Sequence, residues 1–176
     1  MAENSEALEM LKNALDMEEK GKKFYEKAVK ECPNEIGKEI FQFLRDEEIK
    51  HFTRIKEIYQ GLLTGEKWNE KWVELPGSKK DIKPIFRELA KKYALDIKAG
   101  PSELEALNIG IDFEAAAIKY YENHLNRAKN PLERKFIEHL IEEEREHYKI
   151  LEDLKYYYTD PEAWMMEKGR AGLDGA

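Results

Sequence analysis

Residues 46–51 of this chain read DEEIKH, and residues 142–147, which lie 96 positions further on, read EEEREH. Each stretch contains a glutamate followed three residues later by a histidine. The two pairs are Glu48 with His51 and Glu144 with His147. A spacing of three residues places both side chains of a pair on one face of an α-helix. The sequence therefore predicts two helices that each present a carboxylate and an imidazole on the same side.

The offset of 96 positions relates much more of the chain than these two motifs. Between Leu8 and Cys32, eight residues are identical to those 96 positions later, which is more than unrelated helices of this length would share. The offset carries Tyr25 onto Tyr121 and continues without insertion into the Glu-x-x-His motifs. Self-similarity at a fixed offset is the signature of a duplicated unit. We therefore predict two helical hairpins related by a pseudo-twofold axis.

The spacing of apolar residues predicts four long helices and no sheet, because no run alternates with a period of two. The expected helices cover residues 5–31, 34–63, 102–128 and 130–158, and a short C-terminal helix falls within residues 159–176. Residues 64–101, with a short helix expected at 81–94, connect the hairpins of residues 5–63 and 102–158. Four helices with one long crossover form the ferritin-like arrangement. We predict an all-α, ferritin-like four-helix bundle as a single domain over residues 1–176.

Capping residues predict where three helices begin. Ser102 with Glu105 has the spacing of a capping box. Asn130 and Asp160 are each followed by proline, which predicts an N-cap with proline at the first helical position.

The overall composition excludes several classes of protein. The chain has 176 residues, a net charge of −7 and a pI near 5.3, which argues against binding to nucleic acid or to an anionic membrane. No apolar run approaches the roughly 20 residues that span a bilayer, and the acidic N-terminus is unlike a secretory signal, so a cytoplasmic protein is expected. The single cysteine, Cys32, excludes an internal disulfide, a zinc ribbon and a four-cysteine iron site.

Four of the 29 glutamates lie in the middle of apolar stripes. They are Glu18, Glu48, Glu114 and Glu144, one on each long helix. A bundle brings them to one point, where burying each bare carboxylate would cost several kcal/mol and the carboxylates would also repel one another. Two divalent cations would balance four carboxylates, and the neutral imidazoles of His51 and His147 would complete the set of ligands. Mixed oxygen and nitrogen donors favour iron or manganese over metals that prefer thiolates.

Less specific interpretations of the same residues stay open. Glutamate is so common here that a Glu-x-x-His pair can arise without function, and Glu19 could replace Glu18 as the inward acid. Tyr25 and Tyr121 lie two helical turns beyond Glu18 and Glu114 on the same faces. They could hydrogen-bond a ligand carboxylate and fix its orientation, or they could simply be core aromatics.

Other notable side chains are expected to have structural roles. His124 and His139 are predicted to be structural or on the surface, Cys32 is predicted to be inert, and the remaining acids of residues 142–146 are predicted to be solvated. Trp68, Trp72 and Trp164 are predicted to anchor the crossover and the C-terminal segment.

Four motifs carry a resemblance to a known family. They are Ala14-x-x-x-Glu18 followed by Phe24-Tyr25, Asp46-Glu47-Glu48-x-x-His51, Glu114 followed by Tyr120-Tyr121, and Glu143-Glu144-x-x-His147. Over roughly residues 6–63 and 103–158, the chain resembles the rubrerythrin branch of the ferritin-like superfamily. The resemblance implies a non-haem di-iron centre that reduces hydrogen peroxide, and sometimes dioxygen, with electrons from a small redox protein.

The resemblance also implies roles for individual residues. Glu48 and Glu144 would bridge the two metal ions. The terminal ligands would be Glu18 with His51 and Glu114 with His147. The chain departs from the family at Ala117, whose repeat mate is Gly21, because rubrerythrins carry an extra carboxylate at this position. One cysteine also cannot form a rubredoxin domain, so a separate electron-donor protein such as a rubredoxin is implied.

Three functions follow from the sequence as alternatives. The first is an oxidoreductase with two iron ions that reduces peroxide or dioxygen, and the second is an iron-binding protein or ferroxidase without efficient peroxidase activity. The third is a structural helical bundle that binds no metal. Manganese or zinc are the other metals expected in the purified protein. We further expect a homodimer and no nucleic-acid or membrane partner.

Overall fold

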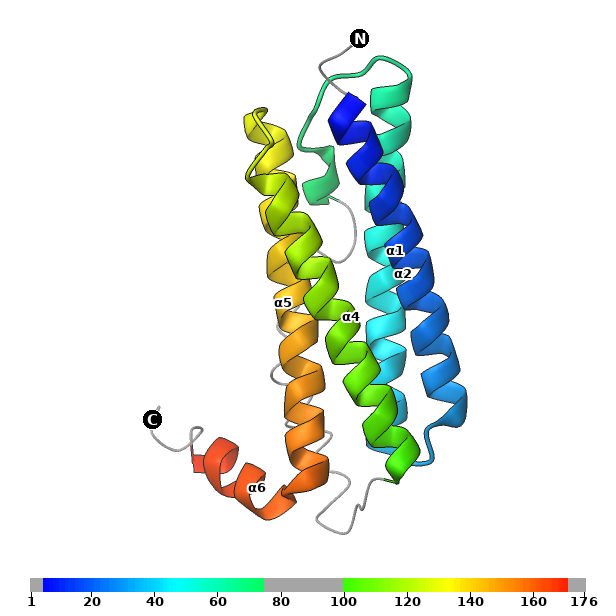
Figure 1. The fold of residues 1–176 in the computed structure, drawn as a ribbon, viewed down its shortest axis with the longest axis vertical. Coiled ribbons are helices and arrows are strands. Elements are labelled where there is room, and N and C mark those ends of the chain that lie inside the picture. The colour runs from blue at the N-terminus through cyan, green and yellow to red at the C-terminus, as the bar shows by residue number, and fades with distance from the viewer. Residues whose placement is uncertain (1–4, 75–99, 171–176) are drawn as a thin grey trace.

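Four long helices lie side by side along the long axis of the computed structural model, which describes residues 5–74 and 100–170 (Figure 1). They are α1 (Ser5–Glu31), α2 (Glu35–Leu63), α4 (Pro101–Leu125) and α5 (Pro131–Thr159). A short 3₁₀ helix, η1 (Lys71–Glu74), follows α2, and α6 (Pro161–Arg170) turns away from the end of α5. The described ranges contain no strand, which confirms the predicted all-α fold. The helix predicted at 81–94 lies outside the described residues.

Side-chain hydrogen bonds determine where α4 ends and where α5 and α6 begin. The sequence predicts that α4 continues to residue 128, but the helix ends at Leu125. Nη1 of Arg134 donates to the carbonyl oxygens of Leu125 and Ala128, at 2.6 and 3.1 Å. These hydrogen bonds hold the turn closed in place of a further helical turn. The side chain of Asn130 caps α5 as predicted, accepting from two backbone N–H groups at 2.9 and 3.4 Å. Asp160 caps α6 in the same way, at 3.0 Å.

The start of α4 differs from the prediction. The helix already begins at Pro101, and Gly100 is its N-cap residue. The backbone N–H of Gly100 donates to Oε2 of Glu103 at 2.9 Å. The predicted capping box of Ser102 with Glu105 is therefore wrong, because the earlier helix start places Glu103 at the position from which a carboxylate reaches back to the cap.

Glu103 also ties α4 to the turn between α1 and α2. Its side chain is buried, and Oε1 accepts from Nδ2 of Asn34 at 2.7 Å and from Sγ of Cys32 at 3.1 Å. The hydroxyl of Tyr158 on α5 donates to the same oxygen at 3.5 Å. Burial and the hydrogen bond to Glu103 raise the pKa of Cys32 to about 12. The thiol is thus protonated at neutral pH, as expected for an unreactive cysteine.

The apolar core is divided into two clusters, and each cluster takes residues from all four long helices. The first cluster includes Tyr25, Ile40, Leu107 and Leu154. The second includes Leu11, Ile55, Tyr121 and Leu140. Along every long helix, the glutamate predicted to face inward lies between the residues of one cluster and those of the other. The core therefore has an apolar part at each end and a polar band between them.

Three tryptophans anchor the segments outside the four long helices, as predicted. Trp68 and Trp72 lie against Phe136 of α5, with ring centroids 6.0 and 5.3 Å apart. Trp164 of α6 meets Tyr157 edge-on at 5.4 Å. Among residues 5–74 and 100–170, no helix combines the length and the apolar character that crossing a bilayer requires.

Replacing Glu103 by alanine is expected to lower the free energy of unfolding by at least about 2 kcal/mol. The substitution removes the acceptor at the start of α4. It also leaves the partly buried amide of Asn34 and the buried hydroxyl of Tyr158 without this acceptor. Ser102→Ala, one position away and exposed, is the matched control and should change stability by less than about 0.5 kcal/mol. Urea unfolding of both variants measures the difference, and equal losses would contradict the assigned cap.

Candidate metal centre

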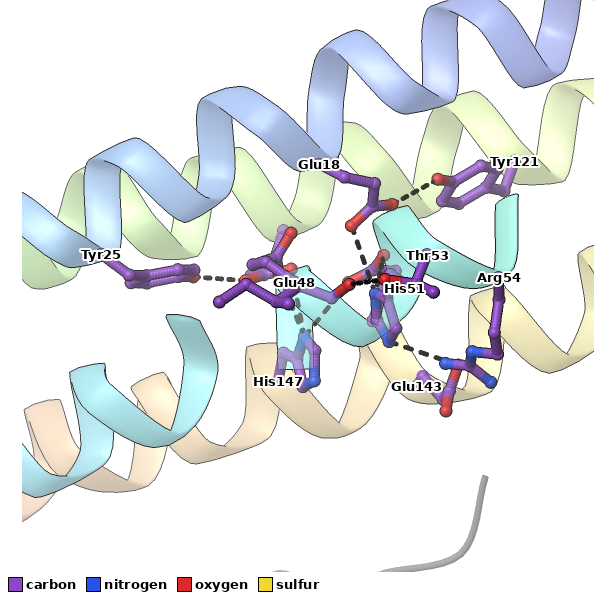
Figure 2. Close-up of polar contacts among 12 residues, drawn as sticks. Glu18, Tyr25, Glu48, His51, Thr53, Arg54, Tyr121, Glu143 and His147 are labelled. Carbon is purple, nitrogen blue, oxygen red and sulfur yellow. Dashed lines mark hydrogen bonds and ion pairs between the residues drawn. The ribbon is translucent and has the colours of Figure 1, made fainter. Parts of the chain in front are cut away.

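Six side chains meet in the polar band between the two apolar clusters, and Figure 2 shows several of them pointing toward a common centre. α1 contributes Glu18, α2 contributes Glu48 and His51, α4 contributes Glu114, and α5 contributes Glu144 and His147. All six side chains are buried, with at most 2% of their surface exposed. The structure therefore brings together, within one chain, all six residues that the sequence predicts as metal ligands.

Each histidine turns its Nδ1 atom toward two or more carboxylates. Nδ1 of His51 lies 3.3 Å from Oε2 of Glu18 and 3.4 Å from Oε1 of Glu144. Nδ1 of His147 lies 3.2 Å from Oε2 of Glu144 and 3.6 Å from Oε1 of Glu48. One ligand atom from each of Glu48, His51, Glu144 and His147 lies within 4.8 Å of all the others. Glu144 thus reaches both histidines, one with each oxygen.

The two tyrosines cross between the hairpins and hold the remaining carboxylates. Tyr121 on α4 donates its hydroxyl proton to Oε1 of Glu18 on α1 at 2.7 Å. Tyr25 on α1 donates to Oε1 of Glu114 on α4, whose other oxygen lies 3.9 Å from Nδ1 of His147. The predicted hydrogen bond from each phenol to a ligand carboxylate is present in the structure. Each tyrosine reaches the glutamate of the opposite hairpin, not the one on its own helix.

Each of the six residues has a buried polar atom that lacks a hydrogen-bond partner. Those that face the centre are Oε2 of Glu18, Oε1 of Glu48, Nδ1 of His51, Oε2 of Glu114, Oε2 of Glu144 and Nδ1 of His147. Nε2 of His51, on the far side of its ring, also lacks a hydrogen-bond partner and lies 3.3 Å from Oε2 of Glu143. Buried polar groups in proteins almost always have a hydrogen-bond partner, so six buried oxygen and nitrogen atoms without one at the same place require an explanation. Four carboxylates and two neutral imidazoles balance the charge of two divalent cations. The donors therefore fit a pair of divalent metal ions.

The backbone of α1 makes room for this centre at Gly21. A Cβ atom at this position would lie 2.7 Å from Oε2 of Glu48 and 2.8 Å from Cε1 of Phe113, closer than real Cβ atoms approach. The repeat mate of Gly21 is the buried Ala117, where the family resemblance leads us to expect an extra carboxylate. Neither hairpin therefore supplies a seventh ligand at this position.

The sequence left Glu19 open as the inward acid in place of Glu18, and the structure excludes it. The side chain of Glu19 is 34% exposed and pairs with Lys22 at 2.7 Å. Glu18 is 2% exposed and faces His51.

A network behind His51 was not predicted. Glu143, expected to be solvated, is only 13% exposed at its side chain, and Oε2 lies 3.3 Å from Nε2 of His51. The same oxygen accepts a hydrogen bond from Nη2 of Arg54 at 2.6 Å. Arg54 is completely buried, and its Nη1 lies 2.9 Å from Nε2 of His139, which is partly buried in a structural role. The repeat contains the signal that was missed, because the mate of Arg54 is the apolar Ile150, and position 54 therefore faces the core.

Burial and mutual repulsion give the titrating groups of the centre unusual pKa values. Desolvation, reinforced by neighbouring carboxylates, raises the pKa of Glu48 and of Glu114 well above 4.5. Burial also opposes the ionisation of Glu144, but the two histidines outweigh it and lower the pKa of this carboxyl group. Burial alone would lower the pKa of His51 and His147, yet the adjacent carboxylates raise both. Without metal ions, the centre therefore holds protons that exposed groups would have released.

The metal-free protein is expected to lose stability as the pH rises from about 5 to 8. The raised pKa values mean that the folded state keeps protons that the unfolded chain releases above pH 4.5 at the carboxyl groups and above pH 6.5 at the imidazoles. For each proton that only the folded state retains, the free energy of unfolding falls by about 1.4 kcal/mol per pH unit. Added divalent metal should oppose this loss, because the ligands must be deprotonated to bind it.

Thermal unfolding with a chelator, and separately with added metal, measures both trends across this pH range. A metal-free melting temperature that rises with pH would contradict the expectation.

Comparison with known proteins identifies the family. The family model for Rubrerythrin matches residues 9–155, a range that contains all six residues of the centre. Neither the curated proteins nor the solved structures gave a match. The family match covers well over half of the chain and agrees with the helical bundle and its buried Glu and His group. The chain belongs to the rubrerythrin family.

Proposed function

We propose that this chain is a di-iron carboxylate oxidoreductase that reduces hydrogen peroxide or dioxygen with electrons from a separate donor protein. The observation that carries the proposal is the set of six unpaired donor atoms buried at one place. Membership of the rubrerythrin family and the compact group of Glu48, His51, Glu144 and His147 support a site for two metal ions. Iron is the metal proposed, because carboxylate and imidazole donors suit it and the reaction requires a redox-active metal.

The positions of the carboxylates support a division of roles among the ligands. Glu144 has one oxygen 3.4 Å from Nδ1 of His51 and the other 3.2 Å from Nδ1 of His147, as a bridging carboxylate requires. Glu48 of α2, whose Oε1 lies 3.6 Å from Nδ1 of His147, would be the second bridge, as the family resemblance implies. The terminal ligands would be Glu18 with His51 and Glu114 with His147. When bound, the iron pair supplies the two electrons that cleavage of an O–O bond consumes.

The surrounding residues orient the ligands and keep water away. Burial, together with the nearby carboxylates, raises the pKa of Tyr25 and of Tyr121 well above 10, so both phenols keep their protons and act as donors. Each phenol occupies one oxygen of a terminal carboxylate and leaves the other oxygen facing the centre. The two apolar clusters close the bundle on both sides of the polar band. The ligands are thus fixed in a site where electrostatic interactions are strong.

A ferroxidase or iron-binding protein without efficient peroxidase activity is the second candidate. The observation that favours it is Ala117, a buried alanine where rubrerythrins are expected to carry an extra carboxylate. The mate position, Gly21, also carries no carboxylate, and a Cβ atom there would lie 2.7 Å from Oε2 of Glu48, so that Glu48 would have to shift.

The proposed electron donor is a separate redox protein such as a rubredoxin, because the single cysteine of these 176 residues cannot build a four-cysteine iron site. All six ligands come from one chain, so metal binding itself requires no second copy. The homodimer expected from the sequence stays a prediction.

Glu18→Gln is expected to reduce the metal content of the protein below the two ions per chain expected for the unaltered protein. Glu18 faces Nδ1 of His51 at 3.3 Å, and an amide cannot replace the charge of its carboxylate. The neighbouring substitution Glu19→Gln is the matched control and should leave the metal content unchanged, because Glu19 points outward toward Lys22. Elemental analysis after anaerobic loading with iron(II) and desalting measures both.

Less than one ion per chain in the unaltered protein would favour the bundle that binds no metal. Equal losses in the two variants would contradict the inward position of Glu18.

Rapid mixing separates the two metal-dependent functions. An oxidoreductase loaded with iron(II) should be oxidised by hydrogen peroxide faster than free iron(II), and reduced rubredoxin should return it to the iron(II) state over many turnovers. A ferroxidase loaded with iron(II) should react faster with dioxygen than with hydrogen peroxide. Reduced rubredoxin should not return it to the iron(II) state over many turnovers. Stopped-flow absorbance under anaerobic conditions follows both reactions, and oxidation no faster than that of free iron(II) by either oxidant would contradict both functions.

A further inference from the structure

The two histidines of the centre are repeat mates, but their outer surroundings differ. Behind His51, Oε2 of Glu143 lies 3.3 Å from Nε2 of the ring. Nη2 of Arg54 donates to this oxygen at 2.6 Å, and Figure 2 shows Arg54 and Glu143 beside His51. Nη1 of Arg54 lies 2.9 Å from Nε2 of His139. The Arg54 side chain is completely buried, so this is a charge pair inside the protein. The ring of His51 is thus backed by a carboxylate that is itself held in place.

The repeat mates of the residues behind His51 are different residues or are paired differently. The offset of 96 relates Arg54 to Ile150 and His139 to Phe43, so neither the guanidinium nor the imidazole has a counterpart. Glu143 does have one, Glu47, but Glu47 pairs with Lys50, whose side chain is 29% exposed. An ion pair with a partly exposed lysine is weaker and less rigid than a buried pair with the planar fork of arginine.

We propose that Glu143 and Arg54 make the two metal positions unequal, and that the position at Glu18 and His51 binds its ion more tightly than the position at Glu114 and His147. The inference rests on the proposed function, because it needs a centre that binds two metal ions. Glu143 and Arg54 are positioning residues in this account. They act through His51 and touch neither ion.

The physical basis is the effect of a carboxylate on the far side of a metal-binding imidazole. A carboxylate at Nε2 favours the tautomer with the proton on that nitrogen, which leaves the lone pair on Nδ1, the atom that faces the centre. It also makes the ring a stronger electron donor and prevents it from rotating. Arg54 donates to Glu143 at 2.6 Å and holds its carboxyl group in position inside the protein, where an unpaired carboxylate would be costly. His51 is therefore better prepared than His147 to bind a metal ion.

Titration with cobalt(II) tests the inference, because this ion resists oxidation and its visible absorption reports the ligands of each position. The unaltered protein should bind two ions in two resolved steps, followed by calorimetry and absorbance. Glu143→Gln should weaken the tighter step by about 10–100-fold, the usual effect of losing such a partner. Glu47→Gln, its repeat mate, is the matched control and should leave both steps unchanged.

Two arginine variants extend the test. Arg54→Met should weaken the same step as Glu143→Gln, and Arg54→Lys, which keeps the charge but loses the planar fork, should weaken it less. If Arg54→Met does not fold, the affinities measured for Glu143→Gln and Arg54→Lys still show whether these two residues strengthen the tighter binding step. Crystals with one equivalent of cobalt(II) should show anomalous scattering at Glu18 and His51 in the unaltered protein, and at Glu114 and His147 in Glu143→Gln.

Two indistinguishable steps in the unaltered protein, or equal weakening by Glu143→Gln and Glu47→Gln, would overturn the inference and leave the metal site intact. Absence of cobalt binding by the unaltered protein would instead overturn the proposed function, and the inference with it.

Discussion

The burial of four carboxylates at the centre of a helical bundle is the constraint on which the rest of this structure depends. Each buried charge costs several kcal/mol unless something compensates it, and here the charges also repel one another. The neighbouring residues respond to this constraint in different ways. Gly21 makes space for Glu48, each tyrosine donates a hydrogen bond to one oxygen of Glu18 or Glu114, and a buried arginine balances Glu143. The remaining charge is what two divalent cations would neutralise.

The two apolar clusters on either side of the centre supply the stabilisation that offsets its buried charges. Each cluster joins all four long helices, so the hairpins are held together at both ends independently of the polar band. This arrangement fixes the relative positions of the helix segments that carry the six inward residues. Residues at functional sites often lower the stability of a protein. In this bundle the destabilising buried charges are confined to the polar band between the two apolar clusters.

The fold and the six inward residues could be predicted from the sequence because both depend on patterns along a single helix. Glu18 and its three counterparts lie in apolar stripes, and the exact offset of the repeat shows that their positions are not accidental. Glu143 and Glu103 could not be recognised in this way, and Arg54 could be recognised only through its apolar repeat mate, Ile150. Their burial depends on partners from other helices, and a charged residue next to a stripe usually faces solvent. The predicted cap at Ser102 failed for a smaller reason, because helix ends are the least certain part of a periodic pattern.

The duplicated hairpin has a consequence for how such a centre can evolve. Two separate copies of one hairpin could build a six-residue centre of this kind only as a symmetric pair, and every substitution would then appear twice. In this chain the hairpins belong to one polypeptide, so Arg54 stands behind one histidine while Ile150 keeps the counterpart position apolar. Joining both hairpins in one chain therefore does more than fix their stoichiometry. It allows selection to change one half of an inherited symmetric site while the other half stays as it was.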